Sequence, residues 1–379
     1  MKPRIILIFS LLLAVACSNE VIVPVPPMQE DISYETHPKN QLYETALRDY
    51  RNATNSPGSV LLIHRPGEEL WIGAVGKSNL AHNTSMNTNS QFRTGSVTKM
   101  FTAVVIMKLI EQGKFTLEDK LANILPTVNG KIPEADQITI RHLLGHLSGI
   151  IDPPNESLRY QADIINNPTD MYAMTLDETL ETYVYGKALH FTPGTSYSYS
   201  NTNYWLLGKI AERTTNKTLQ MLMEEIILTP LGLARTYIEK RDDRNVTRGY
   251  ADLYNNGILM DVTLWDKAEG DGEADGGLIS TAEDLYRFMN GLFHGELVTL
   301  ATLEEMKKIQ LPTCNTPYCE YGLGLEIWRT DAGIAYGHNG GLVGIEANVL
   351  YYEDTGGISV LYKNNGNGSD KSWLDSLMK

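Results

Sequence analysis

Cysteine is scarce in this chain of 379 residues, and positive charge is in the minority. The sequence has 3 cysteines, no C-x-x-C pair and no cluster of cysteine with histidine, so nothing in it indicates a zinc site. Lysine and arginine total 32 against 46 aspartate and glutamate residues, which gives a formal net charge of −14. So acidic a chain lacks the positive surface that binding to nucleic acid or a polybasic contact with a membrane requires. We therefore expect no nucleic-acid partner.

The N-terminal segment has an apolar stretch, but a short one. Lys2 and Arg4 precede this stretch, residues 5–14, and "AVAC" follows it. The pattern is typical of a secretory signal, and the stretch is too short to cross about 30 Å of hydrocarbon as a helix. A cysteine directly after small residues, Cys17, resembles a bacterial lipoprotein cleavage site. We expect residues 1–16 to be the signal peptide and Cys17 to be lipidated, with a plain signal cleavage elsewhere as the alternative.

A tether follows the predicted lipidation site. Residues 17–40 are rich in proline and polar side chains, a composition that predicts an extended linker ahead of a folded domain, residues 41–379. Ser18, and not aspartate, follows the cysteine, which by the bacterial sorting pattern indicates the outer membrane. We expect an exported lipoprotein, periplasmic or on the cell surface, whose only membrane contact is its lipid anchor.

The two remaining cysteines, Cys314 and Cys319, bracket the turn-like insert "NTPY". In an oxidising compartment this arrangement predicts a disulfide, which would close a short loop and contribute about 2 kcal/mol in the chain-entropy model. Two free thiols are the alternative.

Strand-like segments stand at both ends of the folded region, and helix-like segments lie between them. "SVLLIH" and "ELWIGAVG" near the start, and "GIEANVLYY" and "ISVLYK" near the end, have the composition of strands. Ser280 and Glu283 have the spacing of a capping box at the start of a helix. We predict a mixed α/β (α+β) domain in which residues 41–115 and 276–379 build one sheet and residues 116–275 form a mostly helical insertion. The site should lie where these two parts meet.

A serine and a lysine stand one helical turn apart in "FRTGSVTKMFTA", at the head of an apolar helix. Gly95 lets the chain turn sharply into the helix, and Ser96 and Lys99 then share a face. Burial and the positive end of the helix dipole both disfavour the charged form of Lys99, so its amine can act as a base beside the hydroxyl. The unpaired N–H groups of the first turn can stabilise an oxyanion. The alternative is that Ser96 is a helix cap and Lys99 extends to water.

Two further motifs offer partners for this pair. In "SYSYSNTNYWLLG", Tyr199 and Asn201 stand at the start of a helix. A phenol near an ammonium has its anionic form favoured and can shuttle a proton, while the asparagine amide can bind a substrate carbonyl and the lysine. In "GHNGG", His338 ends a strand, where a backbone N–H can complete an oxyanion hole, and Gly340 and Gly341 allow close substrate approach. The alternatives are a helix cap with a surface tyrosine, and a glycine turn with an incidental histidine.

Taken together, these motifs carry a family resemblance. "FRTGSVTKMFTA", "LLGHLSGI", "PGTSYSYSNTNYWLLG", "GGLISTAEDL" and "GHNGG" occur in the order and spacing of the serine β-lactamase and D-alanyl-D-alanine carboxypeptidase superfamily. The chain resembles the branch that holds class C β-lactamases, D-aminopeptidases and related esterases, over nearly all of residues 41–379. The resemblance implies an antiparallel sheet flanked by helices, plus a helical region, and a serine hydrolase that needs no cofactor.

The resemblance assigns a role to each motif residue. Ser96 matches the acylated nucleophile, Lys99 its basic partner, Tyr199 the proton-shuttling phenol, and Asn201 the amide that contacts lysine and substrate. His338 matches the first residue of the third motif, which is lysine in β-lactamases and often histidine in carboxypeptidases and D-aminopeptidases.

The same resemblance bears on the substrate. The backbone N–H groups of Ser96 and Gly341 match the oxyanion hole, with Gly340 beside them. Asn339 stands where the peptidases usually have threonine or serine, which puts recognition of a substrate carboxylate in doubt. We expect a monomer that acts on D-amino-acid peptides of the cell wall, as a carboxypeptidase or aminopeptidase. A β-lactam or an ester is the alternative substrate, and a non-hydrolytic penicillin- or peptidoglycan-binding lipoprotein is the alternative of another class.

Two patterns look like metal sites but lack the remaining ligands. His142 and His146 lie four residues apart, yet no third ligand accompanies them. The segment "DGEADG", residues 271–276, begins like a calcium loop, but the twelfth position is Ala282 and not glutamate. We expect no metal at either place.

Overall fold

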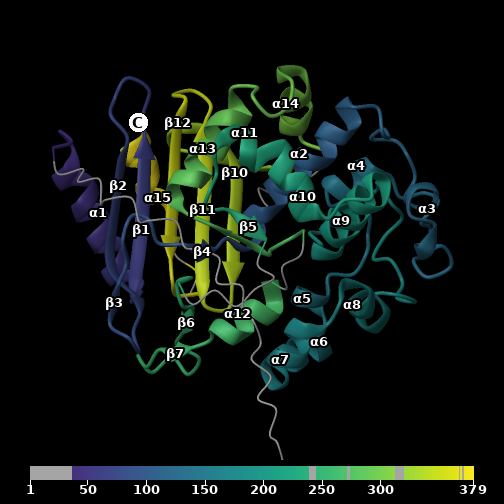
Figure 1. The fold of residues 1–379 in the computed structure, drawn as a ribbon, viewed down its shortest axis with the longest axis horizontal. Helices are drawn as coiled ribbons and strands as arrows, with labels where there is room; N and C mark the ends of the chain where they lie inside the picture. The colour runs from purple at the N-terminus through teal and green to yellow at the C-terminus, as the bar shows by residue number, and fades with distance from the viewer. Residues whose placement is uncertain (1–35, 239–244, 271–273, 312–319, 367, 369–370) are drawn as a thin grey trace, which may run out of the picture. The chain divides into compact units, whose positions relative to one another are not determined.

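One antiparallel sheet dominates the computed structural model, which describes residues 36–238, 245–270, 274–311, 320–366, 368 and 371–379 (Figure 1). In this part of the chain seven strands follow the order β3-β2-β1-β12-β11-β10-β9. The strands are β1 (Gly58–His64), β2 (Trp71–Asn79), β3 (Thr84–Ser85), β9 (Glu326–Thr330), β10 (Gly333–Leu342), β11 (Ile345–Tyr352) and β12 (Gly357–Lys363). Strand β1 pairs with β12 from Ser59↔Lys363 to His64↔Ile358. Both ends of the domain therefore build the sheet, as the sequence predicts.

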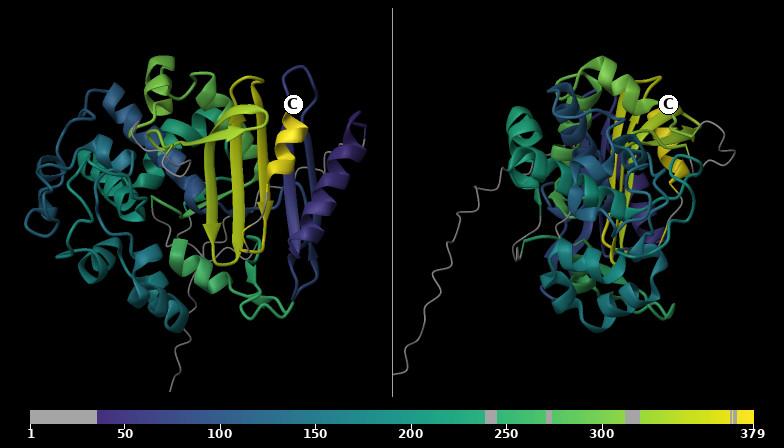
Figure 2. Two further views of the ribbon diagram at one scale, coloured as in Figure 1. Left: turned by 180° about the vertical axis from the view of Figure 1, so that it is seen from behind. Right: turned by 90° about the vertical axis from the view of Figure 1, so that its right-hand side faces the viewer.

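Each face of the sheet is covered by helices. The helices concerned are α1 (Asn40–Ala53), α2 (Thr98–Glu111), α13 (Ala282–Phe293), α14 (Leu300–Lys307) and α15 (Ser372–Met378). Alternate residues of a strand point to opposite faces, so Leu61 packs in the cluster of α1 and α15, whereas Leu62 packs in the larger cluster of α2 and α13. Figures 1 and 2 show α13 on one face and α1 and α15 on the other.

Most of the helical insertion lies beyond the β10 side of the sheet (Figure 1). Its helices are α3 (Leu121–Ile124), α4 (Ile140–Leu144), α5 (Pro153–Glu156), α6 (Leu158–Asn166), α7 (Pro168–Ala173), α8 (Leu176–Tyr183), α9 (Asn201–Thr215), α10 (Leu219–Met223), α11 (Thr229–Leu231) and α12 (Thr263–Gly270). Helical turns at Pro126–Val128 and Glu224–Leu228 and the short strands β5 (Tyr237–Ile238), β6 (Tyr250–Ala251) and β7 (Met260–Asp261) complete this part. Strand β5 pairs with β8 (Leu278–Ser280), which also pairs with β4 (Phe92–Arg93), and both of these strands come from outside the insertion. Most of these helices are short, so tertiary packing rather than helix propensity must hold them.

Helix α2 joins the two parts of the domain. Its apolar residues surround the whole helix, and most of them are buried, which agrees with the apolar helix that the sequence predicts. It contacts α9 and α10 of the insertion and β10 of the sheet. None of the helices among the described residues is both long enough and apolar enough to cross a membrane.

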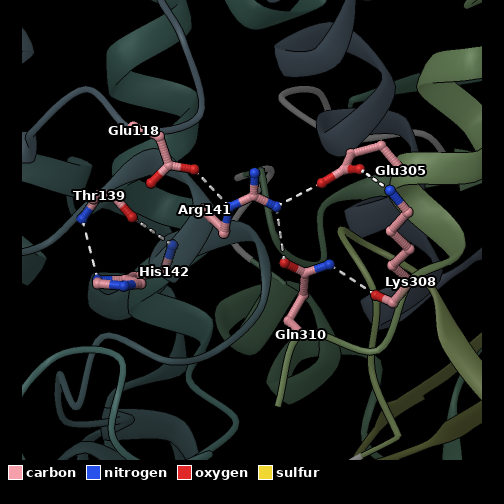
Figure 3. Close-up of polar contacts among 7 residues, drawn as sticks. All are labelled: Glu118, Thr139, Arg141, His142, Glu305, Lys308 and Gln310. Atoms are coloured by element: carbon pink, nitrogen blue, oxygen red, sulfur yellow. Dashed lines mark hydrogen bonds and ion pairs between the residues drawn. The ribbon is translucent and has the colours of Figure 1, made fainter. Parts of the chain in front are cut away.

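An ion-pair network also ties the insertion to the sheet region (Figure 3). Arg141 on α4 lies 2.7 Å from Glu118 and 2.7 Å from Glu305 of α14. The neighbouring His142 is a helix-capping residue, since its Nδ1 accepts a hydrogen bond from Thr139 N and its own N–H donates to Thr139 Oγ1. His142 therefore has a structural role at the start of α4.

The predicted capping box at α13 is wrong by one residue. The N-cap is Thr281, whose side chain accepts from Asp284 N. Ser280 is the last residue of β8, and its hydroxyl lies 2.8 Å from Thr236 Oγ1. Because the strand extends through Ser280, the helix begins one position later than the motif indicates.

Candidate active site

Ser96 lies in a short 3-10 turn that leads directly into α2. Gly95 has a φ of +52°, a left-handed conformation that favours glycine. A Cβ on Gly95 would lie 2.9 Å from Gly341 N, and a Cβ on Gly340 would lie only 1.8 Å from Thr94 O. The glycines of both motifs thus allow this turn to pack directly against the end of β10.

Lys99 follows one turn later, and its side chain is fully buried. Its Nζ lies 2.9 Å from Ser96 Oγ, 2.6 Å from Asn201 Oδ1 and 3.0 Å from the backbone oxygen of Asp275. An ammonium has three donors, so these three acceptors match it fully. The alternative that Lys99 extends to water is therefore wrong.

The buried position weakens the hold of Lys99 on its proton. Burial lowers the pKa of Lys99 from 10.5 to about 8, although the negative charges of Asp275 and Asp152 oppose the shift. Near neutral pH, the neutral amine is thus far more accessible than for an exposed lysine. Lys99 can therefore take a proton from the neighbouring Ser96 hydroxyl.

Tyr199 is the second group on the same oxygen. Its phenol donates a hydrogen bond of 2.8 Å to Ser96 Oγ, and its ring lies 5.0 Å from Lys99 Nζ. Burial, reinforced by Glu326 and Asp152, raises the pKa of Tyr199 well above its usual value, and the hydrogen bond to Ser96 only partly opposes this. The sequence led us to expect that the anionic form would be favoured. The structure differs, because burial outweighs the neighbouring amine, and Tyr199 is a neutral proton donor.

Asn201 is held in place by a carboxylate that the sequence did not reveal. Asp152 Oδ1 accepts hydrogen bonds from Asn201 N, at 3.2 Å, and from Asn201 Nδ2, at 3.1 Å. The amide is thereby oriented so that its oxygen faces Lys99. Asn201 is the first residue of α9 and Ser200 is its N-cap position, so the alternative that Asn201 is a helix cap is wrong. Asp152 stands just before "PP" in the sequence, a loop signal that gives no hint of this contact.

His146 supports Tyr199. In the sequence it stood out only as one of two histidines spaced like metal ligands. Its ring stacks on the Tyr199 ring, with centroids 4.2 Å apart. Its Nδ1 accepts from Ser200 N at 3.1 Å, and its backbone has a φ of +58°, an uncommon conformation outside glycine. His146 therefore fixes the position of the phenol without touching Ser96.

His338 lies behind the cavity. Its Nε2 is 2.9 Å from the Tyr321 hydroxyl, and its Nδ1 is 2.5 Å from the backbone oxygen of Asn339. The ring is fully buried, and its centroid is 6.3 Å from that of Tyr199. Burial lowers the pKa of His338, so the imidazole is neutral. The structure thus places His338 as a support for the third motif and not among the described residues that line the cavity.

The cavity has a volume of about 240 Å³ and opens over Ser96. The described residues that line it are Ser96, Pro154, Asn155, Tyr199, Asn201, Glu269, Asp275, Gly276, Glu326, Asn339, Gly341 and Leu342. Of the residues predicted for the site, Ser96, Tyr199, Asn201, Asn339 and Gly341 line this cavity together, with Lys99 in contact beneath. The signal that could have revealed the acidic residues is weak, because Glu269, Asp275 and Glu326 belong to no shared motif.

Two acidic side chains of this cavity hold their protons more strongly than usual. Burial raises the pKa of Glu269 to about 8 and that of Asp275 to about 6, with neighbouring acidic groups adding to the first. Among the residues that the structure describes, no group of three or more histidine, cysteine, aspartate or glutamate side chains is placed to hold a metal ion.

Cys17, Cys314 and Cys319 lie outside the described residues, so lipidation and the disulfide stay predictions.

Comparisons with known proteins add to this geometry. A model of the Beta-lactamase family matches residues 44–375. The chain is 28% identical over 310 residues to penicillin-binding protein 4* of Bacillus subtilis (strain 168), covering 78% of this chain but only 65% of that relative. It resembles the structure of a D-stereospecific amidohydrolase from Streptomyces sp., with 27% identity, a TM-score of 0.76 and 88% and 98% of the two chains covered. It also resembles a D-amino acid amidase from Ochrobactrum anthropi SV3, with 26% identity, a TM-score of 0.71 and 86% and 92% covered.

Proposed function

This chain belongs to the Beta-lactamase family, a family of serine hydrolases, and from this membership we propose that it forms an acyl-enzyme through Ser96 on D-amino-acid peptides or amides. The family resemblance that the five motifs predict is thereby confirmed. One observation carries the proposal: Lys99 Nζ and Tyr199 OH lie 2.9 and 2.8 Å from the same oxygen, Ser96 Oγ.

The first step is attack of Ser96 on the substrate carbonyl. Neutral Lys99 takes the hydroxyl proton as the Ser96 Oγ–carbon bond forms. The developing oxyanion lies at the contact between the 3-10 turn and β10, where the backbone N–H groups of Ser96 and Gly341 are the proposed donors. Asn201 holds the Lys99 ammonium that results.

Release of the leaving group needs a proton. Tyr199, which is neutral, gives its phenolic proton to the departing nitrogen, and the Lys99 ammonium then returns a proton to the phenolate. The carbon–nitrogen bond breaks and an ester to Ser96 remains. Water then attacks that ester, with the same groups moving protons in the reverse sense, and frees the acid and the Ser96 hydroxyl.

The substrate class draws support from the names of the structural neighbours. One is a D-stereospecific amidohydrolase and another a D-amino acid amidase. We propose cell-wall peptides, reached by an exported lipoprotein, as the source of such D-residues. A β-lactam or an ester remains the alternative substrate, since one catalytic apparatus serves unrelated substrates when the pocket differs.

A substrate panel with the purified protein tests the function. We expect steady hydrolysis of a D-alanyl peptide or amide, and a fall in kcat/KM of roughly a thousandfold or more for Ser96→Ala. Ser85→Ala is the matched control, because Ser85 lies on β3 at the far edge of the sheet from the site. Covalent labelling of Ser96 by a fluorescent penicillin without turnover would favour the binding-protein alternative. Equal rates for wild type and Ser96→Ala would refute the proposal.

A further inference from the structure

The cavity over Ser96 is lined by carboxylates and by no basic side chain among its described residues. Glu269, Asp275 and Glu326 all contribute to its wall. The ammonium of Lys99, which contacts Ser96, already has three acceptors. A substrate with a carboxylate next to its scissile bond would therefore find no cationic partner in this wall and would be repelled by whichever of the acids are ionised.

The three carboxylates are not equivalent. Asp275 is committed to the interior, since its Oδ1 accepts from Trp205 Nε1 at 2.7 Å, and only 5% of the residue is exposed. Glu269, in contrast, has an oxygen, Oε2, that is buried and has no hydrogen-bond partner. A buried carboxyl oxygen without a partner is costly in a folded protein. A cation bound beside Glu269 would satisfy this oxygen and, by lowering the raised pKa of the group, would favour its ionised form.

Glu326, the first residue of β9, offers a second acceptor in the cavity wall. Its Oε2 accepts from Asn339 N and from Trp328 Nε1, both at 3.0 Å, which fixes the side chain. Its Oε1 lies 3.5 Å from His338 Nδ1, but that ring nitrogen is only 2.5 Å from the backbone oxygen of Asn339 and donates there. The carboxylate is thus held rigidly at the cavity wall with one oxygen available to a substrate.

Asn339 points to the same conclusion. Its side chain is a neutral amide, whose oxygen accepts from Asn348 Nδ2 at 2.8 Å. The third motif therefore contributes no cation or hydroxyl at this position. The cavity volume of about 240 Å³ is below the usual range for drug-sized ligands, so a group held by its wall must lie close to the reacting carbonyl.

We propose that this cavity selects substrates with a protonated amine next to the scissile carbonyl, held by Glu269 and Glu326. The substrates are amides of free D-amino acids and short peptides with a free N-terminal D-residue, rather than peptides that are recognised by a terminal carboxylate. This inference rests on the proposed function, and it specifies the charge that the substrate carries on the acyl side of the scissile bond.

Three substrates with one leaving group test the inference in the purified protein. They are the p-nitroanilides of D-alanine, N-acetyl-D-alanine and N-succinyl-D-alanine, which are cationic, neutral and anionic next to the same carbonyl. We expect kcat/KM to fall in that order, by roughly tenfold or more from the first to the second. Glu326→Gln and Glu269→Gln should each lower the ratio of the first to the second substrate by about 10- to 100-fold. Glu296→Gln, an exposed glutamate after α13, is the control that removes a charge without changing the ratio.

The outcomes separate the inference from the proposed function. Equal or faster cleavage of the acetylated or succinylated substrate, abolished by Ser96→Ala, would leave the function standing and overturn the charge selection. If no anilide turns over, protection of Ser96 from a fluorophosphonate label by D-alaninamide, but not by N-acetyl-D-alaninamide, supports the selection. Equal protection by both amides overturns it. Absence of both turnover and labelling overturns the proposed function and the inference with it.

Discussion

The hydroxyl of Ser96 is the acceptor of two hydrogen bonds from groups with very different affinities for a proton. Lys99 has a pKa lowered to about 8 and Tyr199 a pKa raised well above its usual value. The two groups therefore have different roles: the amine removes the proton of Ser96, and the phenol supplies one to the leaving group. This division depends on burial, because an exposed lysine and tyrosine would have nearly equal pKa values.

The pH dependence of acylation follows from the same two groups. Only neutral Lys99 can accept the Ser96 proton, and its pKa is lowered from 10.5 to about 8. We expect kcat/KM for a neutral ester, such as p-nitrophenyl acetate, to rise with pH and to level off above about 8. Stopped-flow acylation rates between about pH 6 and pH 10 measure it. A profile that is flat, or that has its midpoint near the usual lysine value, would contradict this assignment.

Asp152 is a positioning residue whose loss should be visible in kinetics. In Asp152→Asn, the negative charge is lost and one of the two side-chain oxygens becomes a donor. Because Oδ1 accepts from Asn201 and Oδ2 accepts from Asn155, either orientation of the new amide places a donor against a donor, which loosens the hold on Asn201. We expect kcat/KM to fall by about 10- to 100-fold, which corresponds to an unsatisfied buried donor, and the midpoint of the pH profile to move. Asp170→Asn, at an exposed position of α7, is the matched control. A fall in stability with an unchanged pH profile would indicate a purely structural role.

The sequence predicted the residues of this site better than their surroundings. Ser96, Lys99, Tyr199 and Asn201 lie in local motifs whose spacing within a helix or at its start already implies proximity. Asp152 and His146 act through contacts across about fifty residues, and no local pattern encodes such contacts. The prediction that Tyr199 favours its anionic form was wrong for a related reason, since burial is a property of the folded chain.

At the scale of the elements, the contact between the 3-10 turn and β10 decides whether the nucleophile and the proposed oxyanion donors come together. Both sides of that contact carry glycine, and an added Cβ at Gly340 would lie 1.8 Å from Thr94 O. The obstacle is backbone, which has no alternative rotamer, so the two elements would have to separate.

Gly340→Ala should therefore weaken both stability and activity. We expect the free energy of unfolding to fall by about 1–3 kcal/mol, as for other overpacked sites, and kcat/KM to fall at least tenfold. Thermal unfolding and anilide hydrolysis provide the two measurements. For Gly341→Ala, where an added Cβ would meet nothing within 4 Å, we expect the unfolding midpoint to stay near that of the wild type. Equal stability of wild type and Gly340→Ala would show that the turn can move freely.

The sequence predicted the long strands better than the short helices. Strands such as β1 and β12 are long apolar runs, and their positions follow from the sequence. The short helices of residues 116–275, such as α5 and α7, have no clear periodicity and depend on the packing around them. At α13 the cap moved to Thr281 because β8 includes Ser280, a boundary that depends on strand pairing with β4 and β5.

At the scale of the whole molecule, the charge of the chain agrees with the charge of its cavity. The formal net charge of −14 produces a negative field that draws cations toward the protein and repels anions. The selection proposed for Glu269 and Glu326 would thus begin before contact, and it should weaken as salt screens the field.

Attachment to a membrane is a prediction about the whole chain that lies outside the described residues. If Cys17 is lipidated, Cys17→Ser should abolish incorporation of radiolabelled palmitate and release the protein from the membrane fraction of a bacterial host. Cys314→Ser is the control, since the predicted partner of that thiol is Cys319. Incorporation that persists in Cys17→Ser, or soluble wild-type protein, would contradict the lipoprotein prediction.

The pairing of β1 with β12 also governs when this protein can fold. Ser59 meets Lys363, so the centre of the sheet has to wait until almost the entire polypeptide has left the ribosome. A nascent chain with that delay would remain unfolded long enough to be threaded through a translocation channel. Shortening the C-terminus by a single strand should accordingly leave β1 with an open edge and send the newly made chain toward aggregation or proteolysis.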